Sequence, residues 1–167
     1  MLDSTINLVK ANANDVELIE KLAHVIWHEY YPTIISIEQI DYMLSKMYSK
    51  ESLLEQMTEK NDVIYLIYIN NEAQGFISIT KTGENAYFLG KFYILQTNAA
   101  KGKGTRAFKQ LQSILQPESI SLTVNRQNYK SINFYFKNGF VIEKVADFDI
   151  GNNYVMNDFV MTWKKQN

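Results

Sequence analysis

Three apolar segments separated by short turns occupy the middle of the chain, and they constrain its fold more than any other feature. Residues 63–69 are rich in β-branched and aromatic side chains, which favour strands. Segments 76–80 and 86–95 have the same character, and turn-forming residues separate the three at Asn70-Asn71 and at 82–85. Because connections this short join antiparallel neighbours, the sequence predicts a meander of three strands.

Helical patterns dominate the region before this meander. Residues 5–10 alternate apolar and polar side chains, as a half-buried strand does. Three segments with helical spacing follow, and the first of them ends at Tyr31-Pro32. Each begins at a residue type that caps helices: Asn14 with Glu17, Ser36 with Gln39, and Ser49.

After the meander, strands and helices alternate. A loop with two glycines opens a helix that ends at Pro117, a short strand covers 120–124, and a helix covers 129–138. Two strands, 141–150 and 154–163, form a closing hairpin. We therefore expect a mixed α/β (α+β) fold with a largely antiparallel central sheet and helices on both faces. The unit from 86 to 124 is long enough for a parallel crossover.

Composition narrows the chemistry. The 167 residues suit one domain, 1–167. Seventeen basic and eighteen acidic side chains leave a formal charge of −1, which argues against a protein that coats nucleic acid. The absence of cysteine excludes thiolate nucleophiles, and two histidines argue against a metal site. No signal peptide is visible and no apolar run approaches the ~20 residues that cross a bilayer, so we expect a cytoplasmic protein without a membrane partner.

The segment from Lys91 to Arg106 carries the most chemical information. It reads as a strand that runs into a glycine-bearing loop and then opens a helix. Glycines let the backbone approach a ligand closely, and the free N–H groups of a first helical turn favour an anion. This pattern, with Lys101 and Lys103 beside it, fits a phosphate ligand, and it fits a surface loop with solvated lysines equally well. A P-loop is excluded because Gly104 follows Lys103 where Ser or Thr is required, and a dinucleotide fingerprint lacks its third glycine.

Two motifs resemble those of the GNAT-type N-acetyltransferases. The stretch Lys101-Gly102-Lys103-Gly104-Thr105-Arg106 is similar to the family motif Gln/Arg-x-x-Gly-x-Gly/Ala, from which Lys101 and Arg106 depart. The run from Asn128 through Ser131, Phe134 and Tyr135 to Gly139-Phe140 is similar to a later motif of Asn, a small residue, Phe-Tyr and Gly-Phe. The final segment, 149–161, resembles the hairpin that closes many of these domains. The resemblance covers essentially the whole chain and implies an acyl-CoA N-acyltransferase fold with acetyl-CoA as co-substrate and no metal.

The resemblance also implies how the coenzyme is held. The loop and first turn at 101–106 would bind its phosphates. Asn128 would hydrogen-bond the pantetheine or phosphate arm, Ser131 would be the small residue against which coenzyme A lies, and Phe134 would pack beside it.

In the implied reaction an amine attacks the thioester directly, so no cysteine nucleophile is needed. Tyr135 would protonate the departing thiolate, since a phenol with a pKa near 10 can donate to a thiolate of pKa ~8.5. The backbone around Ile94 and Leu95 would stabilise the oxyanion, and such a donor typically lowers the barrier by ~2.7–4 kcal/mol.

The acceptor side is less defined. Trp27, His28 and Tyr31 could wall an acceptor pocket, and an aromatic cluster that packs helices onto the sheet explains them equally well. Candidates for the base are His28, Glu29, Glu38 and Glu84, and the proton could also leave through ordered water. Acidic residues on the closing hairpin would suit a polyamine or a peptide amine, and scattered surface acids explain them as well: Asp147, Asp149 and Asp158.

Different classes of function remain open. One is an N-acetyltransferase that acts on a small-molecule or peptide amine. Another is a non-catalytic acetyl-CoA-binding sensor or regulatory domain, and a third is generic binding of nucleotide phosphates. Phe148, Tyr154 and Phe159 on the closing hairpin would suit a homodimer contact, although one face of that hairpin must pack on the core.

Overall fold

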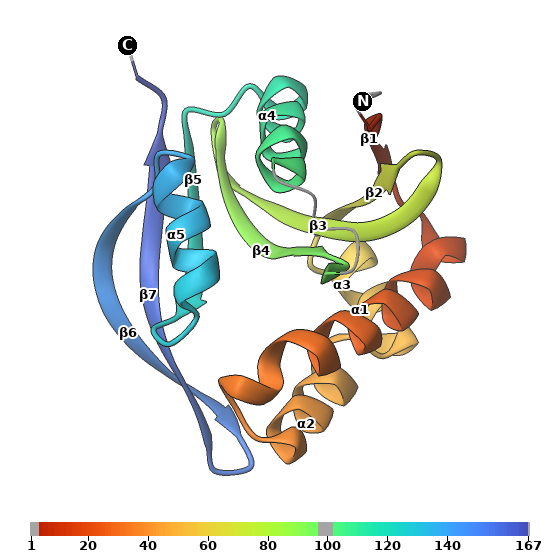
Figure 1. Ribbon diagram of the computed structural model, residues 1–167, viewed down its shortest axis with the longest axis vertical. Coiled ribbons are helices and arrows are strands. Elements are labelled where there is room, and N and C mark those ends of the chain that lie inside the picture. Colours follow the sequence, from red (N-terminus) through yellow and green to blue (C-terminus); the bar gives the residue numbers. More distant parts are fainter. Residues whose placement is uncertain (1–3, 97–101, 167) are drawn as a thin grey trace.

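The chain forms a twisted, seven-stranded sheet with helices on both faces (Figure 1). The structure is a computed structural model that describes residues 4–96 and 102–166. The described strands are β1 (Ile6–Lys10), β2 (Val63–Ile69), β3 (Glu72–Gly83), β4 (Ala86–Ile94), β5 (Ser119–Asn125), β6 (Val141–Gly151) and β7 (Tyr154–Lys164). The described helices are α1 (Val16–Tyr30), α2 (Ile37–Met47), α3 (Lys50–Thr58), α4 (Lys103–Leu115) and α5 (Tyr129–Lys137), with short 3₁₀ turns η1 (Ala13–Asp15) and η2 (Tyr31–Thr33).

The sheet order is β1-β2-β3-β4-β5-β7-β6. The predicted meander is confirmed as β2, β3 and β4, which pair antiparallel in succession. The predicted crossover is confirmed too, because β4, α4 and β5 follow one another and β4 pairs parallel with β5. That pairing covers only Ala86–Phe88 against Ser119–Ser121. Beyond it the two strands diverge, which leaves the second half of β4 without a partner on that side (Figure 1).

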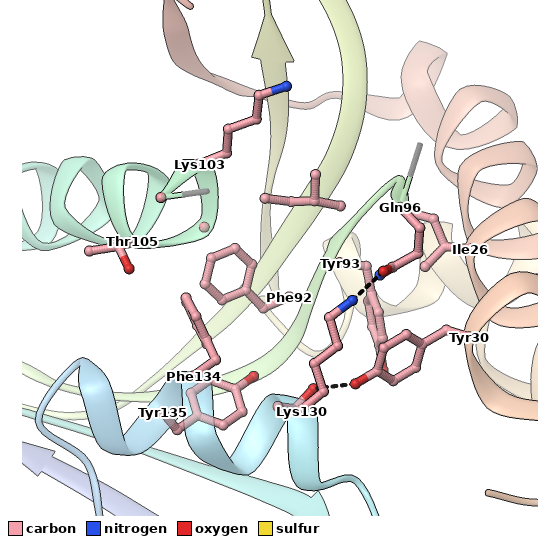
Figure 2. A pocket seen from close by; sticks show the side chains of 14 residues that line it. Ile26, Tyr30, Phe92, Tyr93, Gln96, Lys103, Thr105, Lys130, Phe134 and Tyr135 are labelled. Atoms are coloured by element: carbon pink, nitrogen blue, oxygen red, sulfur yellow. Dashed lines mark hydrogen bonds between the residues drawn. The ribbon is translucent and has the colours of Figure 1, made fainter. Parts of the chain in front are cut away.

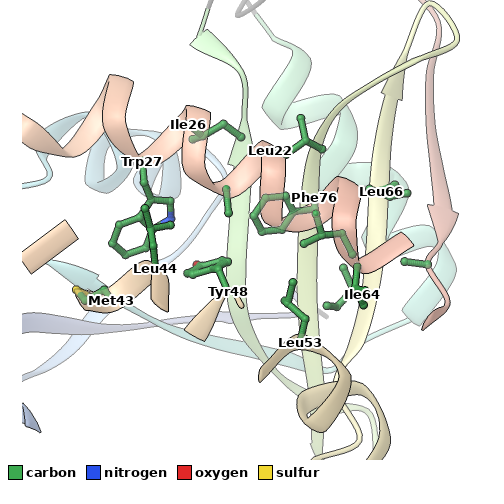
Figure 3. Close-up of a cluster of buried hydrophobic side chains, with 14 of the residues drawn as sticks. Leu22, Ile26, Trp27, Met43, Leu44, Tyr48, Leu53, Ile64, Leu66 and Phe76 are labelled. Carbon is green, nitrogen blue, oxygen red and sulfur yellow. The ribbon is translucent and has the colours of Figure 1, made fainter. Parts of the chain in front are cut away.

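Each face of the sheet buries its own core. On one face, α1, α2 and α3 cover β2 and β3, with Phe76 at the centre (Figure 3). On the other face, α4 and α5 cover the sheet, and Phe108 and Phe140 are fully buried. Phe76 and Ile77 serve opposite cores because successive residues of a strand point to opposite faces. Each such large apolar side chain contributes about 1.5–3 kcal/mol by its burial.

Side chains close in sequence cap the starts of the helices, and one of the predicted caps is wrong. Ser36 Oγ accepts the Gln39 N–H at 3.2 Å at the start of α2, as predicted. The prediction that Asn14 caps the first helix is wrong. Asn12 instead accepts the Asn14 N–H at 2.9 Å, and Asp15 accepts the Asn12 N–H at 2.8 Å. This reciprocal pair starts a 3₁₀ turn two residues earlier, and α1 continues from it at Val16.

The predicted turns are confirmed by their backbone conformation. Asn70 and Asn71, between β2 and β3, have φ of 51° and 67°, in the left-handed region that asparagine tolerates better than most residues. Gly139 follows α5 with a φ of 91°, where a glycine avoids the strain of a Cβ. Within residues 4–96 and 102–166, no helix combines the length and the apolar character needed to span a bilayer.

Candidate active site

Two adjoining pockets lie where β4 and β5 diverge. The first, of about 280 Å³, is lined by residues of α1, β4, α4 and α5 (Figure 2). The second, of about 430 Å³, is lined by residues of α1, α2, α5, β4, β5 and the β6–β7 hairpin. The two share four lining residues, Phe92, Tyr93, Ser131 and Tyr135, so they adjoin at these side chains, and we refer to the two pockets together as the channel.

The start of α4 forms one wall of the first pocket. Gly102 has a φ of 89°, and its carbonyl accepts the Arg106 N–H at 3.0 Å, which closes the first helical turn. The N–H groups of a first helical turn point toward the helix N-terminus and favour an anion there, and this end of α4 faces the pocket. Lys103 and Thr105 line the pocket, whereas Arg106 is exposed and lies outside its described wall. Lys101, the other residue that departs from the family motif, lies outside the described residues.

Gly104 lets α4 approach α5 closely. A Cβ added at this position would lie 2.9 Å from Cε2 of Phe134, which is closer than side-chain atoms normally come. The Phe134 ring packs edge-on against Phe92 at 5.5 Å and against Tyr135 at 5.3 Å. Phe134 is thus held in place on the wall of the first pocket, as Figure 2 shows.

The start of α5 is anchored to α1. Asn128 is 3% exposed, and its Oδ1 accepts the Ser131 N–H at 3.1 Å as the cap of the helix. The same oxygen accepts the hydroxyl of Tyr30, which also lies 3.2 Å from Ser131 Oγ. Ser131 borders both pockets, as expected of a small residue beside a ligand, while Asn128 borders the second pocket and not the first. The side-chain carbonyl of Asn128 is thereby committed to positioning α5.

Tyr135 lies at the junction of the two pockets. Its ring packs against Phe134 and Phe140, both at 5.3 Å between centroids. Burial raises the pKa of its phenol well above the usual range, and Tyr30 nearby raises it further. The hydroxyl is therefore protonated at every physiological pH and is able to donate a hydrogen bond or a proton at this junction.

The unpaired end of β4 supplies backbone groups to the first pocket. Ile94 lines it. The Leu95 N–H donates to the Gln74 carbonyl at 2.8 Å and is already committed to β3. Because N–H groups alternate sides along a strand, the Ile94 N–H points the opposite way, toward the side that β5 leaves open. Of this predicted pair, the Leu95 N–H is thus already bonded to β3, and the Ile94 N–H faces the open side.

The second pocket has mostly aromatic and apolar walls. Trp27 and Tyr31 line it as predicted, with their ring centroids 4.3 Å apart. His28 does not: its Nε2 lies 2.9 Å from Asp41 Oδ1 in an exposed pair on the outer side of α1. The expectation that His28 walls this pocket is wrong, because the helical turn that buries Trp27 and Tyr31 directs the intervening His28 to solvent.

Two charged side chains line the second pocket: Lys91, which no sequence pattern assigned to an acceptor site, and Asp158, one of the three hairpin acids considered for a cationic acceptor. Lys91 donates to Gln56 Oε1 at 2.5 Å, and burial lowers its pKa to about 8. Asp158, on β7, is 5% exposed. Burial raises its pKa to about 6, against the opposing effects of a hydrogen bond from Thr123 and the charge of Arg126.

The remaining candidates for a base lie away from the pockets. Glu29, Glu38 and Glu84 are exposed, and none belongs to the described lining of either pocket. Among the residues that the structure describes, no group of three or more His, Asp or Glu side chains is arranged to hold a metal ion.

Comparison with known proteins identifies the family. A model of the acetyltransferase (GNAT) family matches residues 19–140. The chain is 29% identical over 159 residues to the spermidine N(1)-acetyltransferase of Thermoplasma acidophilum, covering 91% of this chain and 96% of that protein. The crystal structure of the PaiA N-acetyltransferase of Thermoplasma acidophilum with coenzyme A has a TM-score of 0.78 at 28% identity, with 96% of this chain and 99% of that one covered.

A structure of a GCN5-related N-acetyltransferase from Rhodopseudomonas palustris has the same fold, with a TM-score of 0.77 at 14% identity and 99% of both chains covered. The resemblance predicted from the two sequence motifs is confirmed by these matches, which also bear out acetyl-CoA as co-substrate. The chain belongs to the acetyltransferase (GNAT) family and is an acetyl-CoA-dependent N-acetyltransferase.

Proposed function

We propose that this enzyme acetylates a primary amine of a small alkyl amine, with the coenzyme in the first pocket, the acceptor in the second, and Tyr135 as the general acid between them. The observation that carries the proposal is the position of Tyr135, a partly buried side chain with a protonated phenol that lines both pockets.

The residues of the first pocket fit coenzyme A. The first turn of α4 offers N–H groups to phosphate, with Lys103 at the pocket wall. Beyond them the wall becomes apolar at Phe92 and Phe134, which suits a pantetheine arm. Ser131 is small enough to let a ligand lie against α5.

Acetyl-CoA supplies the thioester that the amine attacks. The Ile94 N–H would donate to the carbonyl oxygen as negative charge develops there, which is worth ~2.7–4 kcal/mol in comparable sites. Tyr135 would then give its proton to the leaving sulfur as the carbon–sulfur bond breaks. The attacking nitrogen would lose its proton through ordered water, and a proton from the same water would restore the phenol. Burial raises the pKa of Tyr135, and burial of the thiolate in the same apolar junction would raise the pKa of the thiol in the same direction.

The second pocket favours a slender, cationic acceptor. Its walls include Trp27, Met43, Met47 and Met156, which would contact an alkyl chain. The similar protein from Thermoplasma acidophilum is a spermidine N(1)-acetyltransferase, so polyamines are the first acceptors to test.

The deciding experiment pairs binding with turnover. Thermal unfolding is measured with acetyl-CoA, coenzyme A and ATP, and free thiol release is then followed with spermidine, diaminobutane and a panel of amino acids and peptides. We expect the two coenzyme forms alone to raise the midpoint, since a ligand at 100 times its Kd adds ~2.7 kcal/mol, and polyamines to give the highest kcat/KM. Preference for peptides over alkyl amines contradicts the acceptor class, and equal protection by ATP contradicts the assignment of the first pocket.

A further inference from the structure

The second pocket contains a buried carboxylate, Asp158, one oxygen of which has no hydrogen-bond partner among the described residues. That oxygen is Oδ1, and it is buried. An acceptor oxygen without a partner in a low-dielectric site costs about 1–3 kcal/mol, more for a charged group, so such groups in native structures usually have a ligand, a water or a functional role.

The nearby cations make their direct contacts with other groups, although the charge of Arg126 lowers the pKa of Asp158. Arg126 is paired with Asp147, with 2.6 Å between its NH2 nitrogen and Asp147 Oδ1, and Asn157 donates to the same oxygen at 2.8 Å. None of the ion pairs found among the described residues includes Asp158. Lys91, across the pocket, donates to Gln56 and packs over the Tyr48 ring at 5.3 Å, so its ammonium is directed toward α3.

The position of Asp158 is set by the strands around it. It pairs with Asn125 at the end of β5, where β4 has already diverged, so β7 presents this side chain to the channel. The pocket that it lines also contains Tyr135, and Asp158 is the sole carboxylate among the described residues of that pocket. Around it lie apolar side chains of the hairpin and of α2.

We propose that the Asp158 carboxylate binds an ammonium group of the acceptor within the second pocket and thereby selects cationic alkyl amines. This inference rests on the proposed function and adds to it the residue that determines specificity. The ammonium supplies the hydrogen-bond donor that Oδ1 lacks, and the methionine-rich walls contact the alkyl chain. Asp158 is thus a substrate-binding residue, and Tyr135 remains the group that protonates the leaving sulfur.

The test compares wild type with Asp158→Asn, which removes the charge and keeps the shape. Steady-state rates are measured at saturating acetyl-CoA with 1,4-diaminobutane, which is cationic, and with butyric hydrazide, a weakly basic nucleophile of similar length that is uncharged at the assay pH. The matched control is Asp149→Asn on the same hairpin. Asp149 is exposed and outside the pocket, and asparagine can still accept the Gly151 N–H, now accepted at 2.8 Å.

We expect Asp158→Asn to lower kcat/KM for diaminobutane about 10- to 100-fold, as loss of a charge-assisted hydrogen bond does. The kcat/KM for the hydrazide and the KM for acetyl-CoA should each change less than about threefold. Equal losses for both nucleophiles, or no loss for the diamine, overturn the inference. If wild type binds coenzyme A but acetylates neither nucleophile, the proposed function fails instead. Calorimetric titration of diaminobutane into the coenzyme A complex of both proteins then decides the role of Asp158, because weaker binding by the variant supports it and equal binding overturns it.

A variant that does not fold also leaves a decisive measurement. Wild type in complex with coenzyme A is titrated with diaminobutane and with its uncharged analogue 1,4-butanediol. Preference for the diamine by about tenfold or more supports an ammonium site in the pocket, and equal affinity for the two overturns it.

Discussion

Replacement of Tyr135 by phenylalanine tests the general-acid assignment directly, because it removes one oxygen from the junction of the two pockets. The phenyl ring keeps its packing against Phe134 and Phe140, both 5.3 Å away, so the free energy of unfolding should change by less than about 1.5 kcal/mol. The catalytic effect should be much larger. General acid catalysis contributes about 10²–10⁴-fold, which corresponds to ~2.7–5.5 kcal/mol of activation free energy.

The pH dependence of the defect identifies its cause. Burial keeps the Tyr135 phenol protonated, so the wild-type donor is available throughout the assay range. A thiol in water ionises near pH ~8.5, and the same burial raises its pKa, so protonation of the leaving group matters most below that pH. We therefore expect the ratio of wild-type kcat to Tyr135→Phe kcat to be largest near pH 6.5 and to shrink as the pH rises above 9.

The assay is thiol release under saturating acetyl-CoA and diamine, together with calorimetric binding of coenzyme A, which should be unchanged in the variant. Tyr87→Phe is the matched control, because Tyr87 lies outside the described walls of both pockets and donates to the Leu115 carbonyl at 3.5 Å. Turnover by Tyr135→Phe equal to wild type at every pH would refute the general-acid reasoning. A loss explained by weaker coenzyme binding would assign Tyr135 to binding instead.

Three further predictions concern the walls of the site. Gly104→Ala should weaken coenzyme binding by about 1–3 kcal/mol, because its Cβ would lie 2.9 Å from Phe134 and force that ring into the pocket. A raised KM for acetyl-CoA, returned to the wild-type value by a second substitution, Phe134→Leu, confirms this prediction, and an unchanged KM contradicts it. Asn128→Ala should lower the free energy of unfolding by about 1–3 kcal/mol in urea titrations, since it removes the cap of α5 and leaves the Tyr30 hydroxyl without this acceptor. Asp158 has a pKa of about 6 in the folded protein and about 3.9 when unfolded, so its protonation favours the folded state. Wild-type stability relative to Asp158→Asn should therefore be greatest below pH ~4 and fall by at most about 3 kcal/mol as the pH rises through 6, whereas a difference independent of pH contradicts the raised pKa.

Much of the fold could be predicted because its signals are local. Asn70-Asn71 marks the turn between β2 and β3, and Ser36 caps α2, through contacts that span only three residues. The prediction that Asn14 caps the first helix was wrong for an equally local reason. Asn12 lies two residues earlier and is the same residue type, so the preference of asparagine for helix starts fits either position. The glycine-bearing start of α4 and the Asn128–Phe140 motif likewise identified the family from short stretches of sequence.

The order of the elements, their periodicity and the motifs of the family are therefore all readable from the chain's local patterns. Which side chains meet in the channel depends instead on how distant segments pack. Asp147, Asp149 and Asp158 look alike along the hairpin, yet the first pairs with Arg126, the second is exposed, and Asp158 alone is buried. That difference depends on the divergence of β4 from β5 and on which face of β7 covers the opening, and both follow from packing between segments far apart in the chain. Burial of a carboxylate and the commitment of a backbone N–H, as at Leu95, are properties of such long-range contacts, and no local pattern encodes them.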